Sequence, residues 1–271
     1  MRRKVISAMM VLFGIGLAFG GEVPVKPFKV DEHTLFLCHF DREGFVADYA
    51  RGKREPLDVK NVDLDEGKFG NCISISKERE DVGKAVCLRY SLKDNINLER
   101  GTLEFWICPQ TDLTNLPLPT YFLIFSIDCY NPQTKGYGFG YSRFTQWGSF
   151  QVSLYDHSIE INRRRVDFFS PIKKWKAYEW HYIKIIWSKE GCGLYIDGKR
   201  AEGDLYYYAE DKKNDIKEKR TKLFIPYPVG IEGDVENLTL IIGPNKEEHS
   251  FGYCIDELRI SDIVRKEKKR K

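Results

Sequence analysis

The sequence predicts an all-β protein folded as a sandwich or a barrel. The strongest signal lies in residues 178–200, where Ile183, Ile185 and Trp187 recur at every second position, as in a half-buried strand. Asp197-Gly198, near the end of this stretch, is typical of a two-residue hairpin turn. Aromatic residues make up 14% of the 271 residues, which favours strands. No segment has the periodicity of an amphipathic helix.

The N-terminal segment, residues 1–20, matches a secretory signal peptide. Arg2-Arg3-Lys4 forms a basic start, residues 5–19 form an apolar run, and residues 18–20 (AFG) fit a small-x-small cleavage site. The run is shorter than the roughly 20 residues that a membrane-spanning helix needs. The sequence therefore predicts export to the periplasm, the cell surface or the extracellular space, with no spanning segment after cleavage.

Strand-like segments follow one another after a leader at residues 21–33. Each is a short run of apolar and β-branched residues bounded by Gly, Pro, Asn or Asp. The expected strands cover residues 34–40, 71–76, 85–90, 101–109, 121–129, 136–141, 149–155, 159–169, 180–188, 192–196, 237–243 and 252–261. The polar residues 41–67 show few strand cues, and residues 110–119 carry the turn signals of a loop.

Residues 201–236 interrupt this series of strand-like segments. They hold three consecutive tyrosines at 206–208, a charged patch at 210–213 and the segment FIPYP at 224–228. We expect a long loop insertion here, and long loops on a rigid β scaffold are often functional. The chain ends in a basic tail at residues 264–271, which we expect to be solvated.

The charge balance argues against a nucleic-acid-binding protein. Residues 1–20 carry three of the 43 Lys and Arg and none of the 40 Asp and Glu, so the remainder is close to neutral. Residues 265–271 hold six Lys and Arg and one Glu, which leaves residues 21–264 with 34 Lys and Arg against 39 Asp and Glu, a net charge of −5. A basic surface, the signature of nucleic-acid binding, is therefore not expected.

The chain has seven cysteines, at positions 38, 72, 87, 108, 129, 192 and 254. No Cys-x-x-Cys or Cys/His cluster occurs, which argues against a structural zinc site. The odd count leaves at least one thiol without a partner in the chain. Six paired cysteines and one free one, or seven free ones, both agree with the sequence.

Four groups of residues resemble the laminin-G-like domains, in the order in which that family has them. They are residues 37–41 (LCHFD) with Ala47-Asp48 and 67–70 (GKFG), residues 101–107 (GTLEFWI), residues 179–182 (EWHY) with 194–199 (LYIDGK), and residues 253–261 (YCIDELRIS). The resemblance spans residues 34–263. It implies a concanavalin A-like fold, a two-sheet antiparallel jelly-roll β-sandwich whose first and last strands are neighbours. The insertion at 201–236 departs from the family pattern.

Catalytic residues of enzymes with this fold are missing from the sequence. Laminarinase-type hydrolases place acids on one strand as Glu-x-Asp-x-x-Glu, because a retaining mechanism needs two carboxylates close together. Glu104 stands alone on its strand, and Asp256 and Glu257 are adjacent, so alternation predicts that they point to opposite faces. We therefore expect that the protein is not an enzyme. His39 and His181 lie among apolar residues and are expected to be partly buried structural side chains.

Calcium is the one cofactor that the resemblance implies, as a structural ion. Related jelly rolls hold calcium at the edge of the sandwich with the acid of the last strand, which is Asp256 here. Asp41 and Asp48 are the expected neighbouring ligands, since calcium takes several oxygen ligands. In the alternative interpretation, Asp256 only orders a turn or pairs with Arg259.

A sugar site needs exposed aromatic rings with polar groups beside them. The candidates in a Gly-rich hairpin are Tyr137, Tyr141, Phe144 and Trp147, and those in the insertion are Tyr206, Tyr207, Tyr208 and Tyr227. The alternative is that these rings pack on the sandwich, which alternating strand positions favour.

The sequence thus predicts an exported, non-catalytic laminin-G-like domain that binds carbohydrate at the cell surface. The expected partner is a polysaccharide or glycoconjugate. The alternative is a surface adhesion or assembly module that binds a protein, and a glycan-active hydrolase or lyase is a weaker third hypothesis.

Overall fold

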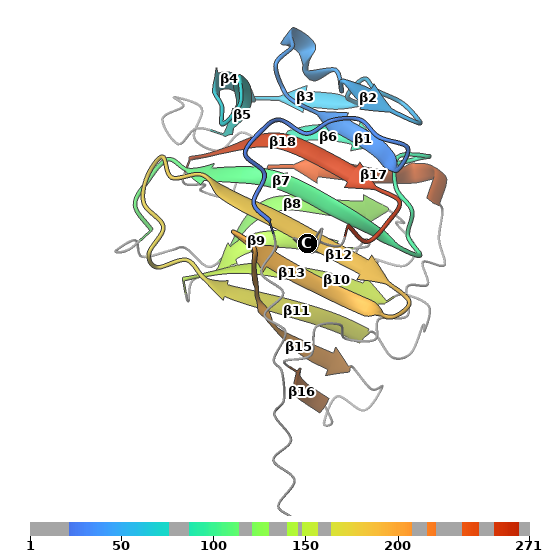
Figure 1. The fold of residues 1–271 in the computed structure, drawn as a ribbon, viewed down its shortest axis with the longest axis vertical. Helices are drawn as coiled ribbons and strands as arrows, with labels where there is room; N and C mark the ends of the chain where they lie inside the picture. The colour runs from blue at the N-terminus through green and yellow to red at the C-terminus, as the bar shows by residue number, and fades with distance from the viewer. Residues whose placement is uncertain are drawn as a thin grey trace, which may run out of the picture.

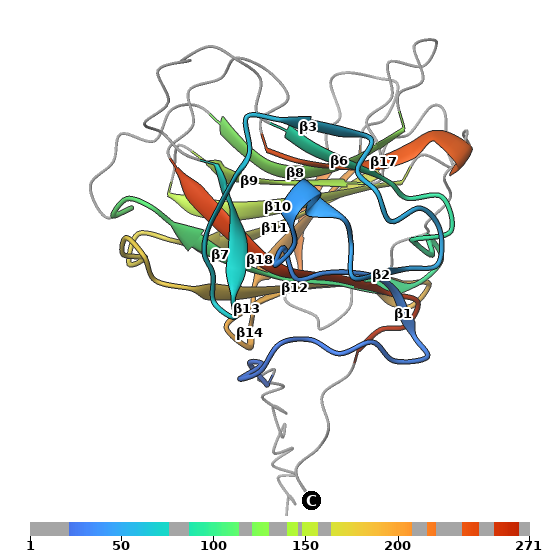
Figure 2. The same ribbon diagram turned by 90° about the horizontal axis from the view of Figure 1, so that it is seen from above.

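The computed structural model describes residues 22–75, 87–113, 121–129, 140–145, 148–156, 164–207, 216–220, 235–243 and 252–265. Within these residues the protein is built from strands, with two short 3-10 helices, η1 (Glu43–Phe45) and η2 (Val235–Asn237). The strands form two sheets stacked face to face, as Figures 1 and 2 show from two sides. This confirms the predicted two-sheet antiparallel β-sandwich.

Sheet A contains nine strands in the hydrogen-bonded order β14-β13-β12-β7-β18-β1-β2, with β5 paired to β18 and β4 to β5. All its pairs are antiparallel. Its strands are β1 (Thr34–Cys38), β2 (Tyr49–Ala50), β4 (Asp63–Glu66), β5 (Asn71–Ile75), β7 (Gly101–Pro109), β12 (His181–Ser188), β13 (Gly191–Ile196), β14 (Lys199–Arg200) and β18 (Tyr253–Ser261).

Sheet B also contains nine strands, in the order β16-β15-β11-β10-β9-β8-β17-β6-β3. It too is antiparallel throughout. Its strands are β3 (Asp58–Lys60), β6 (Cys87–Ser91), β8 (Tyr121–Cys129), β9 (Gly140–Thr145), β10 (Ser149–Asp156), β11 (Arg164–Pro171), β15 (Glu202–Tyr207), β16 (Ile216–Arg220) and β17 (Leu238–Ile242).

Two predictions from the sequence are wrong in detail. The polar residues 41–67 contain the short strands β2, β3 and β4, and the segment expected to be a loop at 201–236 begins with β15 and contains β16. These strands escaped prediction because β4 (DLDE) and β16 (IKEKR) are rich in charged residues and lack an apolar alternation. The strand β15 extends sheet B by pairing with β11 along six residues.

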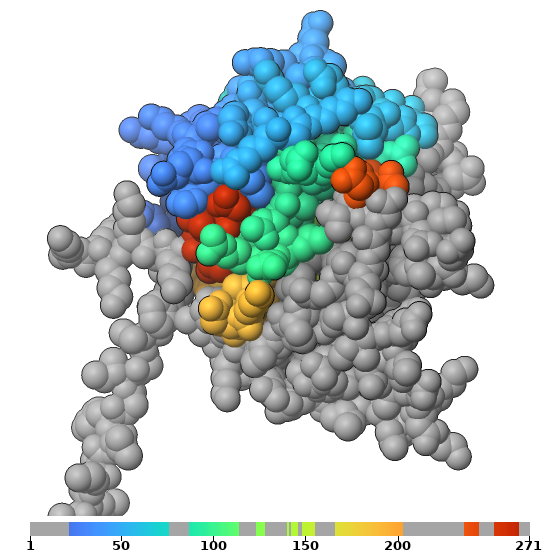
Figure 3. All heavy atoms as spheres, turned by 90° about the vertical axis from the view of Figure 1, so that its right-hand side faces the viewer, coloured from blue at the N-terminus to red at the C-terminus, as the bar shows by residue number. Residues whose placement is uncertain are grey.

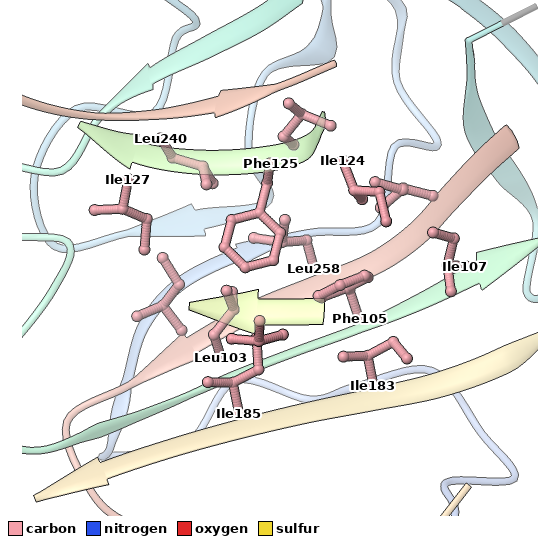
Figure 4. Packing of buried hydrophobic residues seen from close by; sticks show 14 of the residues in the cluster. Leu103, Phe105, Ile107, Ile124, Phe125, Ile127, Ile183, Ile185, Leu240 and Leu258 are labelled. Atoms are coloured by element: carbon pink, nitrogen blue, oxygen red, sulfur yellow. The ribbon is translucent and has the colours of Figure 1, made fainter. Parts of the chain in front are cut away.

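The hydrophobic core lies between the two sheets. Every second residue of β7 and β12 points into it, and so do their counterparts in β8 and β17. Figure 4 shows this interlayer with the labelled residues Leu103, Phe105, Ile107, Ile124, Phe125, Ile127, Ile183, Ile185, Leu240 and Leu258. Phe144 and Trp187 belong to the same core, both fully buried. Phe144 is therefore a core residue rather than an exposed sugar-stacking ring.

The hairpins around residues 181–200 form as the sequence predicts. β12 pairs with β13 from Ile183 opposite Ile196 to Ser188 opposite Gly191. Asp197 and Gly198 join β13 to β14 with positive φ values of 49° and 74°, as a type I′ turn requires at both central positions.

The two ends of the domain lie together. β1 pairs with β18, as the resemblance implies, and Arg265 forms a bidentate ion pair with Asp31 at 2.7 and 2.8 Å. Figure 3 shows the C-terminal residues (red) against the N-terminal ones (blue) on one side of the molecule. Within the described ranges, no helix is long and apolar enough to cross a membrane.

Candidate functional site

The outer face of sheet B, meaning the face turned away from sheet A, carries a row of polar side chains. In β10 the residues Phe150, Val152 and Leu154 point into the core. Gln151 and Ser153 alternate with them and therefore point outward. The register places Ser153 opposite Asp167 of β11, and Gln151 opposite Arg143 of β9. Three neighbouring strands thus bring four polar residues to one patch.

Arg143, Gln151, Ser153 and Asp167 form a hydrogen-bonded chain, which we call the polar network. The Nε atom of Arg143 donates to Oε1 of Gln151 at 2.9 Å. The amide nitrogen of Gln151 donates to Oγ of Ser153 at 3.0 Å, and that hydroxyl donates to Oδ1 of Asp167 at 2.7 Å. The chain fixes the orientation of a guanidinium, an amide, a hydroxyl and a carboxylate.

The polar network is buried although it lies outside the core. Gln151, Ser153 and Asp167 are exposed by 1, 0 and 1%, and Arg143 is half-buried. Burying such groups costs free energy unless they are hydrogen-bonded, which the network provides. Of the four residues, Arg143 is the one that a ligand can contact from solvent, and the buried groups hold its guanidinium in a fixed orientation.

A second polar feature of this face is Thr145, which ends β9. Its hydroxyl is buried and has no hydrogen-bond partner within the described residues. It follows Arg143 by two positions, so strand alternation places it on the same face as the polar network. This end of β9 therefore holds hydrogen-bonding capacity that the described part of the chain does not use.

Four of the predicted aromatic residues differ in their position relative to the polar network. Tyr141 lies in β9, in register with Ser153 of β10 and Ser126 of β8. Tyr207 ends β15, in register with Arg164 and Ile216. Trp147 and Tyr227 lie outside the described residues. Backbone register therefore brings Tyr141 to the strands of the polar network, while Tyr207 lies farther along the sheet.

Sequence reasoning missed the polar network itself. The signal was present in β10, where polar residues at 151 and 153 alternate with apolar ones at 150, 152 and 154. One strand's alternation does not reveal its neighbours, however, and the partners on β9 and β11 follow only from the register.

The three predicted metal ligands lie at one end of sheet A. Each of them accepts a hydrogen bond from a backbone amide. Oδ1 of Asp41 accepts a hydrogen bond from the Asn71 amide at 2.7 Å, and Oδ2 of Asp256 accepts one from the Phe69 amide at 2.9 Å. Oδ2 of Asp48 accepts one from the His39 amide at 2.8 Å. Asp41 and Asp256 thus hold the two sides of the turn that leads into β5, which agrees with the alternative that Asp256 orders a turn.

Gly67 and Gly70 explain how the two carboxylates come so close to this turn. A Cβ atom at Gly70 would lie 2.2 Å from Oδ1 of Asp41, and one at Gly67 would lie 2.8 Å from Oδ2 of Asp256. Gly70 also has a positive φ of 92°, which glycine adopts most readily. The GKFG segment is therefore required by these close approaches.

A β-bulge corrects the expectation that Asp256 and Glu257 point to opposite faces. The register of β18 against β7 shifts between Asp256 and Arg259, and Glu257 has a positive φ of 55°. Oε2 of Glu257 accepts a hydrogen bond from the Phe28 amide at 2.6 Å, and Oε1 lies 2.5 Å from Nδ1 of His39. The two carboxyls therefore lie on the same outer side of sheet A, because the bulge adds a residue that breaks the alternation.

Both carboxyls are fully buried. The pKa values of Asp256 and of the neighbouring His39 are shifted by these surroundings. Burial, with the nearby charge of Glu257, raises the pKa of Asp256 to about 7. The hydrogen bond that Nδ1 of His39 donates to Glu257 raises the pKa of His39. The other oxygen of Asp256, Oδ1, is buried with no hydrogen-bond partner in the described part of the protein.

These residues do not form a ready calcium site in this arrangement. Calcium needs six to eight oxygen ligands around one point. The described residues contain no group of three or more His, Cys, Asp or Glu side chains placed to hold a metal ion. Asp41 and Asp48 accept hydrogen bonds from backbone amides, and the buried Oδ1 of Asp256 has no hydrogen-bond partner among the described residues. Calcium at Asp256 stays a prediction, which thermal unfolding with calcium and with chelator would test.

Comparisons with known proteins show the fold. No protein-family model and no curated protein matches the chain. The ligand-binding domain of botulinum neurotoxin serotype D, crystallised with N-acetylneuraminic acid, superposes with a TM-score of 0.57 at 14% identity, over 86% of this chain and 48% of that one. The binding domain of Paraclostridial Mosquitocidal Protein 1 gives a TM-score of 0.56 at 14% identity, over 86% and 49%. The receptor-binding domain of botulinum neurotoxin type G gives 0.53 at 11% identity, over 86% and 48%.

The class that these findings define is a two-sheet antiparallel β-sandwich. The chain spans about half the length of the binding domains that it resembles. None of these structures is named as a laminin-G-like protein, so that family stays a resemblance.

Proposed function

We propose that this protein is a non-catalytic binding module whose ligand is a polysaccharide or glycoconjugate, bound on the outer face of sheet B. The observation that supports this best is the polar network of Arg143, Gln151, Ser153 and Asp167. Arg143 is the member of the network that a ligand can reach, and its planar guanidinium suits sugar hydroxyls or carboxylates. Tyr141, on the same strand, is proposed as a stacking residue. One structural neighbour was crystallised with a sialic acid, and several are named as binding domains.

Export and a place at the cell surface are part of this proposal. The signal-like residues 1–20 support them, because a module that binds extracellular glycans must leave the cytoplasm. Trp147, Tyr207 and Tyr227 are proposed as further stacking residues.

A glycan array followed by calorimetry tests the binding. We expect neutral or acidic glycans to bind, and Gln151→Ala to weaken the best ligand about tenfold, because it breaks the network at its centre. Gln110→Ala is the matched control, since Gln110 is a half-buried glutamine on sheet A. An array without any binding glycan, or equal affinity in Gln151→Ala, would remove the proposal.

The alternative, an adhesion or assembly module that binds protein, rests on a different surface. Leu57 and Val59, at the edge strand β3, are exposed by 45 and 42%. Exposed apolar residues beside an unpaired strand edge suit a protein partner. Self-association that Val59→Lys removes, with no glycan bound, would favour this function.

A glycan-active hydrolase remains the third hypothesis. Asp256 and Glu257 are the two acids that the bulge brings to one side, but each is fully buried and holds backbone. Turnover of any polysaccharide by the purified protein would revive it.

A further inference from the structure

The residues before β1 run across the outer face of sheet A. We call residues 22–33 the strap. In Figure 2 the strap is the dark blue ribbon outside sheet A, on the side away from sheet B. It contains no strand and no helix, so contacts with the sheet hold it in place.

Phe28 is the residue that anchors the strap. It is exposed by 6%, and its ring packs edge-on against Tyr182 with 6.4 Å between the ring centres. Its amide donates to Oε2 of Glu257 at 2.6 Å, and the guanidinium of Arg259 lies 4.2 Å from the centre of its ring. Because both the ring and the backbone of Phe28 are fixed, the residues on either side of it are held on the surface of the molecule.

The strap presents two valines to solvent. Val25 is exposed by 82% and Val30 by 48%, although valine is an apolar residue. Each valine has an exposed lysine beside it, Lys26 and Lys29. A single exposed apolar residue is common on protein surfaces. Two of them on one anchored segment, each next to a cation, form a small surface that is both apolar and basic.

The basic tail leaves the domain beside this surface. Arg265, the last described residue, forms the bidentate ion pair with Asp31, which directly follows Val30. The amide of Arg265 also donates to Oγ1 of Thr102 at 2.9 Å, so the root of the tail is fixed. Residues 266–271 (KEKKRK) hold five cations and one acid. Six residues span at most about 20 Å, which keeps all of these charges within reach of the strap.

The strap and the tail carry the positive charge of the molecule. Residues 22–33 hold two Lys against three Asp and Glu, and residues 262–271 hold six Lys and Arg against two Asp and Glu, which gives a net charge of +3. The rest of residues 21–271 holds 32 Lys and Arg against 35 Asp and Glu, a net charge of −3. The sequence alone predicts a solvated tail, and the exposed valines at its root are the reason to assign it a partner.

We propose that the strap and the tail form a docking surface for an anionic lipid bilayer. Negative headgroups attract the cations of the tail and of Lys26 and Lys29. Val25 and Val30 then enter the boundary between the headgroups and the acyl chains, as the apolar side of a membrane-surface segment does. A soluble polyanion would complement the cations but would leave the valines in water. Docking in this way turns the outer face of sheet B, with the polar network, away from the bilayer.

Vesicle sedimentation of the protein without the predicted signal residues 1–20 tests the proposal, since their apolar run would itself bind lipid. One set of vesicles contains phosphatidylcholine alone, and the other contains phosphatidylcholine mixed with phosphatidylglycerol. We expect at least about tenfold tighter binding to the mixed vesicles at low salt. Most of this binding should be lost at high salt, because salt screens exposed charges.

A double variant of the strap tests the role of the valines. Val25→Asp with Val30→Asp should weaken binding to the mixed vesicles about tenfold or more, because two apolar side chains that enter the bilayer are replaced by anions. Val59→Asp is the matched control, because Val59 is exposed by 42% but lies on β3 of sheet B. It should bind as the wild type does.

A double variant of the tail tests the role of its charge. Lys268→Glu with Lys269→Glu should also weaken binding about tenfold or more, because it reverses two cations that face the headgroups. Lys173→Glu with Lys174→Glu is the matched control. It makes the same change in net charge at two exposed lysines between β11 and β12, and it should keep the wild-type affinity.

Equal binding to the two kinds of vesicle would overturn the proposal. Wild-type affinity in the double valine variant would overturn it as well, since the tail would then act only as a polycation. Thermal unfolding shows whether each variant is folded. The proposal does not depend on the glycan site: Gln151→Ala should bind the vesicles, which carry no glycan, as the wild type does.

Discussion

Glu257 is constrained in both its backbone and its side chain. It has a φ of 55°, although it is not a glycine, and it is fully buried. Its carboxylate binds His39 and the Phe28 amide, so it ties β18 to both β1 and the N-terminal segment. Removing one partner of a buried charged pair typically costs about 3–5 kcal/mol. Alternation could not predict this role, because the bulge that turns Glu257 outward leaves no clear signal in the sequence.

Asp256 and His39 both make stability fall as the pH rises. The pKa of Asp256 is raised to about 7 by burial, so the folded state holds its proton more tightly than the unfolded state does. Its contribution is therefore lost between about pH 4 and pH 7. The pKa of His39 is raised by Glu257, so its contribution is present below about pH 6.5 and is lost as the pH rises through its folded value.

Asp256→Asn should flatten this pH dependence. Asparagine can still accept the Phe69 hydrogen bond, but it does not ionise. Urea unfolding should find the variant within about 0.5 kcal/mol of wild type at pH 4, and roughly 2 kcal/mol more stable at pH 8. Asp41→Asn is the control, because Asp41 also accepts a hydrogen bond from a backbone amide but is exposed. Parallel pH profiles for wild type and Asp256→Asn would contradict the buried-carboxyl assignment.

The hairpins β12–β13–β14 show how far strand patterns predict structure. Ile183, Ile185 and Trp187 face the core as the period-2 pattern predicts, and His181 is buried and stacked on Trp175 at 3.8 Å. The pattern did not predict that Asp197 would do more than turn the chain. Its carboxylate accepts hydrogen bonds from the Tyr182 amide and from Nδ1 of His181, both at 2.8 Å.

Asp197→Ala should therefore destabilise the fold more than the replacement of a residue that only forms a turn. The variant loses two hydrogen bonds and leaves the buried Nδ1 of His181 without its acceptor, so we expect about 2–3 kcal/mol of destabilisation in chemical unfolding. Asp94→Ala is the matched control, because Asp94 also has a positive φ, of 62°, and lies exposed. The free energy of unfolding that Asp94→Ala loses should be about 1 kcal/mol or less. Equal losses in the two variants would mean that the Asp197 contacts contribute nothing.

At the scale of the whole molecule, the sequence predicts the sandwich but not its site. Short alternating strands and turn residues predict an all-β fold, and the pairing of first and last strands follows the family resemblance. The polar network depends on three strands meeting in one register, which no single segment encodes. The extension of sheet B by β15 and β16 depends on pairing in the same way.

The two faces of the molecule are chemically different. The outer face of sheet A carries buried aromatic residues, the buried cysteines Cys72, Cys108 and Cys254, and the Glu104–Arg259 ion pair at 2.7 Å. The outer face of sheet B carries the polar network. The difference supports the proposal that the ligand site lies on sheet B.

An amide chemical-shift titration of the isotope-labelled protein with its best array glycan tests the central claim most directly. The largest shifts should fall in β9, β10 and β11, around Arg143, Ser153 and Asp167, with small changes in β5 and β18. Shifts concentrated at Asp41, Asp48 and Asp256, or at the edge strand β3, would contradict a ligand site on the outer face of sheet B.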